Sequence, residues 1–227
     1  MSKNIPVITI DGPSGSGKGV ITQKLANHLG FNILDSGALY RLIGLSARKH
    51  DIRLDDEKSL AERAKVLDIQ FRPTGKAEEP LQVLMEGEDV TLQIRTDQAG
   101  VDASKVAALG QVRESISELQ HHFRQPPGLV ADGRDMGTVV FTDAIVKIYL
   151  TASAEARAER RYKQLKDKDI SVSLHDLFQS IQARDERDMN RKVAPLKPAD
   201  DAIIIDSTEL DINQVFDQVL SAVKARL

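Results

Sequence analysis

The chain has 227 residues, which suits one sizeable α/β domain with room for a small insertion and argues against two equal domains. Its 31 basic and 34 acidic residues leave a net charge of -3, so no global field draws it to nucleic acid, and any anion site must be local. The lack of cysteine excludes disulfides, thiolate metal sites and a cysteine nucleophile, and a cytoplasmic location is expected. No apolar run approaches the roughly 20 residues that span a bilayer, so no membrane partner is expected.

The first predicted strand and the loop after it organise the chain. An apolar, β-branched run over residues 5–11 stops at a glycine-rich loop, and a helical pattern begins directly after Lys18. Gly12, Gly17 and Lys18 have the spacing of a phosphate-binding loop, in which backbone N–H groups and a helix N-terminus bind an anion. An ordinary glycine-rich turn would leave the lysine without a purpose.

The end of this loop departs from the general pattern. Lysine is usually followed there by a serine or threonine whose hydroxyl binds magnesium, whereas Lys18 is followed by Gly19 and Val20. We therefore expect no protein metal site. Mg²⁺ is expected to be held mainly by nucleotide phosphates and water, with a distant carboxylate as a further ligand.

The following segments predict a parallel sheet flanked by helices. A short apolar stretch over 31–35 precedes a helical pattern over 38–43, so the strand–helix order repeats. That order gives right-handed crossovers and places ligands at the carboxyl ends of the strands. Further strands are predicted to begin at residues 129, 144 and 202, and further helices to cover 111–119, 174–190 and 212–227 and to begin at 154. The predicted fold class is therefore an α/β P-loop fold.

The stretch over residues 57–104 has a different texture and is predicted to be an inserted α+β subdomain. A parallel core does not need its short strands. The predicted elements are a charged helix around residues 60–67, strands at 68–71 and 81–85, turns at Pro73-Thr-Gly75 and 86–89, and a helix through 96–108.

Four segments together resemble bacterial cytidylate kinases. They are Gly12-Pro-Ser-Gly-Ser-Gly-Lys-Gly19, Leu34-Asp-Ser-Gly-Ala-Leu-Tyr-Arg41, Asp132-Gly-Arg-Asp-Met-Gly-Thr-Val-Val140 and Arg184-Asp-Glu-Arg-Asp-Met-Asn-Arg191. The resemblance covers essentially the whole chain and implies a single kinase domain, 1–227, with a CMP-binding insertion at 57–104 and a lid at 154–191. It implies transfer of the ATP γ-phosphoryl to CMP or dCMP, with Mg²⁺ bound to the ATP. A monomer is expected.

The resemblance also implies roles for individual residues. Those implied to bind ATP are Gly12, Pro13, Ser14, Gly15, Ser16, Gly17, Lys18, Gly19 and Val20. Those implied to bind CMP are Ser36, Arg41, Ser104, Arg113, Arg134, Asp135, Arg184, Asp188 and Arg191. Those implied to act on the transferring phosphoryl are Lys18, Arg134, Arg160 and Arg161, with neighbouring Arg157 as an alternative lid arginine.

Within the CMP set the resemblance separates three tasks. Arg41 and Arg134 clamp the phosphate, and Arg184 with Asp188 recognises the pentose. The residues implied to face the cytosine are Ser36, Ser104, Arg113, Asp135 and Arg191. A carboxylate suits cytosine because it accepts a hydrogen bond from the exocyclic amino group, whereas uracil would present a carbonyl there.

The residue types support this chemistry independently. The acceptor phosphate is already ionised near neutral pH, so no general base is needed. Two polyanions must nevertheless meet in line, and that encounter needs several arginines and lysines around the transferring group.

Structural roles and other functions stay open at this level. Asp132 could only cap its turn, and the arginines over 157–161 and the charges over 184–191 could form solvated helix faces. A P-loop GTPase is disfavoured because Asp97-Gln-Ala-Gly100 has no accompanying guanine motif. A kinase acting on a hydroxyl would need a base such as Asp35, Asp132 or Asp135. A nucleic-acid binder is disfavoured by the acidic balance and the lack of tryptophan.

Val20 generates a first prediction, because relatives usually place a threonine there whose hydroxyl reaches a phosphate. Losing one charge-assisted hydrogen bond is worth about 1.5–3 kcal/mol at most. Val20→Thr should therefore lower the KM for ATP several-fold and leave the KM for CMP nearly constant in steady-state kinetics. If neither constant changes, the hydroxyl is dispensable in this loop.

Overall fold

The structure is a computed structural model that describes residues 5–73, 81–167 and 169–226. The chain forms two compact units, and each is described by itself. The first unit comprises Met1–Ser36 and Gln120–Leu227, and the second comprises Gly37–Leu119.

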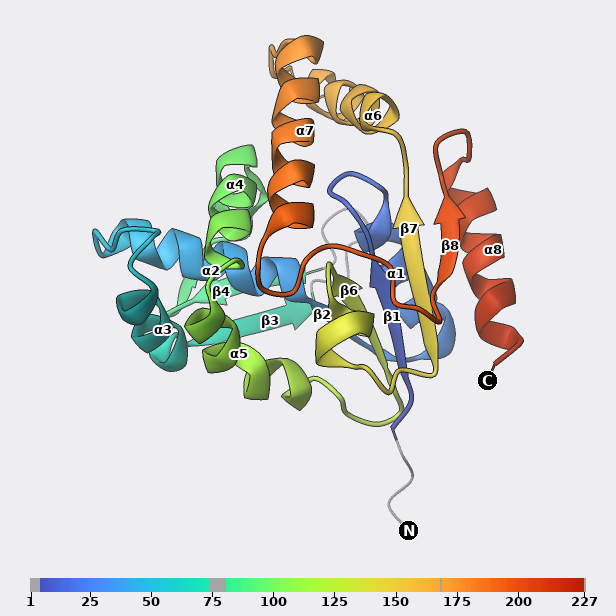
Figure 1. The fold of residues 1–227 in the computed structure, drawn as a ribbon, viewed down its shortest axis with the longest axis horizontal. Helices are drawn as coiled ribbons and strands as arrows, with labels where there is room; N and C mark the ends of the chain where they lie inside the picture. Colours follow the sequence, from blue (N-terminus) through green and yellow to red (C-terminus); the bar gives the residue numbers. More distant parts are fainter. Residues whose placement is uncertain (1–4, 74–80, 168, 227) are drawn as a thin grey trace. The chain divides into compact units, whose positions relative to one another are not determined.

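The first unit contains a five-stranded parallel sheet in the order β2-β6-β1-β7-β8 (Figure 1). The strands are β1 (Val7–Asp11), β2 (Asn32–Asp35), β6 (Leu129–Gly133), β7 (Val146–Thr151) and β8 (Ile203–Asp206). Residues of β1, β6 and most of β7 are buried without alternation, as expected for parallel strands covered on both faces. The α/β parallel-sheet prediction is confirmed.

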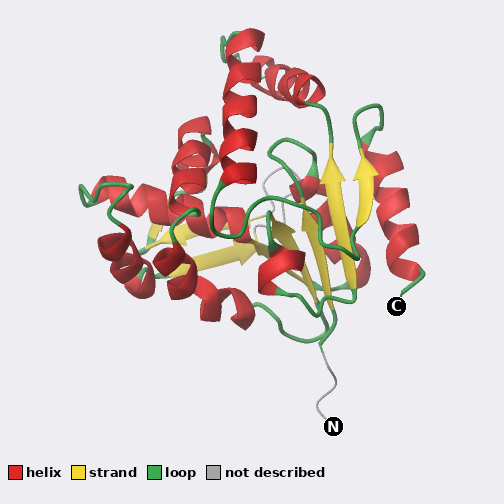
Figure 2. Cartoon of the chain, in the orientation of Figure 1, coloured by secondary structure: helices red, strands yellow, loops and turns green. Residues whose placement is uncertain are grey.

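Helices cover this sheet and extend from it (Figure 2). They are α1 (Lys18–Leu29), α6 (Ala154–Lys166), α7 (Leu174–Asn190) and α8 (Ile212–Lys224). Apolar residues of α1 and α8 form the main core with the sheet, where Ile8, Leu25 and Val219 are fully buried. Helices α6 and α7 pack on each other through a smaller cluster that includes Ala158 and Leu177.

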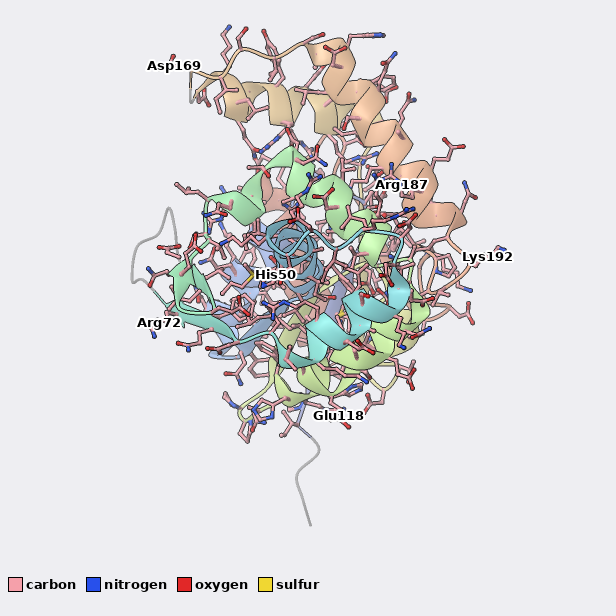
Figure 3. All side chains as sticks on the ribbon, turned by 90° about the vertical axis from the view of Figure 1, so that its left-hand side faces the viewer. His50, Arg72, Glu118, Asp169, Arg187 and Lys192 are labelled. Carbon is pink, nitrogen blue, oxygen red and sulfur yellow. The ribbon has the colours of Figure 1, made fainter. Side chains whose placement is uncertain are left out.

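The pair formed by α6 and α7 carries most of the charged segment that the sequence places at 154–191. Figure 3 shows Asp169 at the end of the pair where the two helices connect, Arg187 along α7, and Lys192 just after it. Each helix begins at a serine whose hydroxyl accepts a backbone N–H, Ser153 for α6 and Ser173 for α7.

The second unit combines helices with a small antiparallel sheet in the order β3-β4-β5. Its elements are α2 (Ser36–Lys49), α3 (Glu57–Val66), β3 (Ile69–Pro73), β4 (Leu81–Met85), β5 (Glu88–Asp89), a 3₁₀ turn (Gln93–Arg95), α4 (Asp97–Val106) and α5 (Gly110–His122). The predicted antiparallel strands are confirmed. Of the predicted turn at Pro73-Thr-Gly75, the last two residues lie outside the described residues.

An ion pair fixes α2 against α4 in the second unit. Asp102, almost fully buried, accepts hydrogen bonds from Nε and Nη2 of Arg48, the latter at 2.9 Å, and from Gln98. The helices pack so closely that a Cβ at Gly44 would lie 3.0 Å from the Asp102 Cβ. The Asp-x-x-Gly match that begins at Asp97 lies in helix α4, whose helical geometry does not favour a GTPase switch loop.

One element differs from the prediction. The sequence indicates only a turn after β6, whereas Met136–Val140 forms a short π-helix. Its first N–H groups are bound by the carboxylate of Asp11, at the end of β1, so a long-range contact determines the local structure. Within the described part of the chain, no helix is long and apolar enough to cross a membrane.

Candidate active site

The phosphate loop connects β1 to α1. Gly12 has a φ of 150°, and a Cβ there would lie 2.0 Å from the carbonyl oxygen of Leu150, so only glycine allows the loop to leave the sheet against β7. Gly17 precedes α1 as its N-cap, and Lys18 is the first helical residue. The N–H groups of this first turn lack intrahelical acceptors and favour an anion. Val20 is 52% exposed, so a threonine there requires no repacking.

Lys18 folds back over the loop instead of extending into water. Its side chain is largely buried, and Nζ donates a hydrogen bond to the carbonyl of Pro13 at 2.7 Å. Burial, together with the positive charge of Arg134, lowers the pKa of Lys18 to about 7. An anion bound in the loop would restore its charged form.

Three carboxylates meet at the carboxyl edge of the sheet. In the strand register, Asp132 of β6 is paired with Asp35 of β2 and with Ile10, the residue before Asp11 in β1. Burial raises the pKa of Asp132 to about 7 and that of Asp11 to about 6. Asp132 also lies beside Lys18, and the lysine charge lowers the pKa of Asp132, against the larger effect of burial.

Asp11 holds the segment that follows β6. Its two carboxylate oxygens accept the backbone N–H groups of Met136 at 2.9 Å and Gly137 at 2.8 Å. This fixes the chain directly after Arg134 and Asp135, both of which are predicted site residues. The sequence analysis gave Asp11 no role, and the only signal was a carboxylate at the end of an otherwise apolar strand.

Five of the predicted CMP residues come together in the first unit. Nε of Arg134 donates to Asp188 at 3.0 Å, and Nη2 of Arg191 donates to Asp135 at 3.4 Å. Burial lowers the pKa of Arg134, but the charge of Asp188 and its hydrogen bond outweigh that effect and raise it. Arg184 lies 4.0 Å from Asp188, four residues further along α7. These buried pairs keep the arginines charged.

Ser36 is buried, and its hydroxyl accepts a hydrogen bond from Nε2 of Gln120 at 3.0 Å. The sequence gave no signal for Gln120, whose partner lies 84 positions away. Gln120 therefore orients a predicted cytosine-facing hydroxyl.

The three candidate lid arginines lie on α6 and differ in their surroundings. Arg160 donates to the carbonyls of Ser207 and Thr208, after β8, and Arg161 is its neighbour on the helix. Arg157 is buried and donates to Asp185 of α7 at 2.5 Å. The solvated helix face considered for these residues is wrong for Arg157.

The other predicted CMP residues belong to the second unit. Arg41 in α2 donates to the carbonyl of Ile94 at 2.6 Å. Arg113 in α5 donates to the carbonyl of Ala107 at 3.3 Å, and Ser104 is buried in α4. The structure describes these residues within their own unit.

The fold and the arrangement of Lys18 and the buried arginines define a P-loop phosphotransferase. The comparisons with known proteins specify it further. The family model for cytidylate kinase matches residues 8–225, and the chain belongs to this family. Relatives named cytidylate kinase from Pseudomonas fluorescens and Azotobacter vinelandii are 58% and 55% identical, covering 100% of this chain and 98% of each relative. A crystal structure of an uncharacterized protein from Eubacterium ventriosum shares the fold at a TM-score of 0.50 and 13% identity, covering 97% of this chain and 99% of that chain.

The lowered pKa of Lys18 predicts that ATP binding takes up a proton. At about pH 8.5 the free lysine is mostly neutral, and bound phosphates raise its pKa, so uptake should approach about one proton per ATP. Calorimetry in two buffers of different ionisation enthalpy measures this number. In Lys18→Arg the guanidinium is charged in both states, so the uptake should nearly vanish. Equal uptake by both proteins would assign the proton to another group.

Proposed function

We propose that this protein transfers the γ-phosphoryl group of ATP to CMP or dCMP, giving CDP or dCDP. The observation that carries the proposal is Arg134, a buried and charged guanidinium at the end of β6, the strand next to the one that leads into the phosphate loop. A monophosphate bound at Arg134 and a triphosphate bound in the loop would share one edge of the sheet. A cytoplasmic location and a monomeric state remain predictions.

The reaction needs positioning and charge neutralisation more than proton transfer. The acceptor oxygen of a nucleoside monophosphate is ionised near neutral pH, so no residue must act as a base. Lys18 exchanges its hydrogen bond to Pro13 for the ATP phosphates and gains full charge. Arg134, held by Asp188, does not have to reorganise to meet developing negative charge, which is the condition for electrostatic catalysis.

Asp135 is the proposed determinant of the cytosine base. It is 2% exposed, and Arg191 binds one of its oxygens. An ionised carboxylate accepts from the exocyclic amino group of cytosine and repels the carbonyl that uracil presents instead. Ser36, Arg41, Ser104, Arg113 and Arg184 are included as CMP ligands on the strength of the family resemblance.

Magnesium is proposed to act as the counter-ion of ATP, neutralising its phosphates. Among the described residues no group of three or more His, Cys, Asp or Glu could hold a metal. One carboxylate nevertheless lies near the missing hydroxyl, since Oδ2 of Asp132 is 3.6 Å from where a Cβ at Gly19 would be. This donor set suits an ion held mainly by phosphates and water, with Asp132 binding that water.

The proposal is tested by comparing kcat/KM for CMP, dCMP and UMP in a coupled assay. The unaltered protein should prefer the cytidine nucleotides, and a preference for UMP would contradict the proposed function. Asp135→Ala should lower kcat/KM for CMP more than for UMP, narrowing their ratio by about tenfold or more. The control Asp176→Ala, an exposed residue in the first turn of α7, should keep the ratio. Equal losses for CMP and UMP would mean that Asp135 only orders Arg191.

A further inference from the structure

Arg157 is one of the most buried charged residues of the first unit, with 4% of its surface exposed. It lies in the first turn of α6 and forms a two-point ion pair with Asp185 of α7. The Nη1–Oδ1 distance is 3.1 Å and the Nη2–Oδ2 distance is 2.5 Å. A planar guanidinium and a carboxylate in this arrangement fix the two helices in one orientation.

The same guanidinium also holds the phosphate loop. Its Nη1 donates to the carbonyl of Ser14 at 3.0 Å, and its Nε donates to the carbonyls of Ala152 and Ser153 at 2.9 and 3.2 Å. Nε, Nη1 and Nη2 are thus all engaged within the protein. Arg157 is tied at once to the loop, to the end of β7 and to α7.

The aliphatic part of Arg157 supports the loop from below. Gly15 has a φ of 78°, and a Cβ there would lie 3.3 Å from the Arg157 Cβ and 3.6 Å from its Cγ. The loop therefore rests directly on this side chain. A larger residue at position 15 would strain the backbone and push against the arginine stem.

Helix α7 makes a second contact with the same loop residue. Nη1 of Arg184 donates to the hydroxyl of Ser14 at 3.0 Å. Ser14 is thus held through its carbonyl by Arg157 and through its hydroxyl by Arg184. Since Asp185 is next to Arg184 in sequence, the ion pair and the hydroxyl contact act on one turn of α7.

We propose that Arg157 is a positioning residue that, with Asp185, holds the phosphate loop at Ser14 in the shape that binds the phosphates of ATP. The inference rests on the proposed use of residues 12–20 for ATP. It separates Arg157 from Arg160 and Arg161, because its donors are already used and its departure would leave the Asp185 charge buried without its partner. Arg157 does not reach the transferring phosphoryl.

Two variants distinguish this role from that of a lid arginine. Arg157→Lys keeps the charge and loses the fork, while Asp185→Asn keeps Arg157 and loosens it. A positioning role predicts that each variant weakens binding of the non-hydrolysable analogue β,γ-imido-ATP by about tenfold, and that the double variant is no weaker than the weaker single variant. Calorimetry provides the dissociation constants, and thermal melts confirm that each variant is folded.

Other outcomes overturn the inference. A lid arginine would give a lower kcat with unchanged analogue affinity in Arg157→Lys, and Asp185→Asn would leave activity intact or raise it. A purely structural pair would lower the melting temperature in both variants without changing the affinity. If Arg157→Lys fails to fold, the analogue affinity of Asp185→Asn alone decides.

The matched control is Asp102→Asn, which disrupts the two-point Arg48–Asp102 pair of the second unit. It should lower the melting temperature and leave the affinity for β,γ-imido-ATP unchanged. Failure of the unaltered protein to bind the analogue would contradict the proposed function itself. Normal binding by the unaltered protein and both variants would contradict only the role of Arg157.

Discussion

Burial of ionised groups at the carboxyl edge of the five-stranded sheet is the constraint on which the rest of the first unit depends. Taking a charge out of water costs several kcal/mol unless an opposite charge and hydrogen bonds compensate. Three arginine–aspartate pairs meet this requirement, and they are Arg134 with Asp188, Arg157 with Asp185 and Arg191 with Asp135. Each pair joins segments that are distant in sequence, so the same charges that suit a polyanion also fix where α6 and α7 lie relative to the sheet.

Burial leaves the same edge poorly compensated around neutral pH. The pKa values of Asp11 and Asp132 rise from 3.8 to about 6 and 7, so the folded protein binds more protons than the unfolded chain in that window, and the free energy of unfolding falls as pH rises through it. The pKa of Lys18 falls from 10.5 to about 7, which has the opposite effect above neutrality. The cost to stability lies where nucleotide phosphates would restore the charge of Lys18, so ligand binding would offset it.

Local patterns predicted much of this fold because they depend on neighbouring residues. The loop after β1 was predictable from glycines and a lysine at fixed spacing, and α7 from its apolar period and its serine cap. The π-helix after β6 was not, because the carboxylate of Asp11, 125 positions away from Met136, determines it. Gln120 was missed for the same reason, since nothing in its surroundings indicates that it binds Ser36.

The arginines of α6 and α7 show most clearly where sequence reasoning about the site ends. Their spacing predicts only that they share helix faces, and a face can be solvated, paired or turned toward a ligand. What separates Arg157 from Arg160 is the partner that each meets. Arg157 finds the buried carboxylate of Asp185 and a loop carbonyl, whereas Arg160 finds carbonyls after β8. Because a charge that already has a buried partner is costly to move, its partner, rather than its position in the helix, decides whether an arginine shapes the phosphate loop or remains available to the substrate.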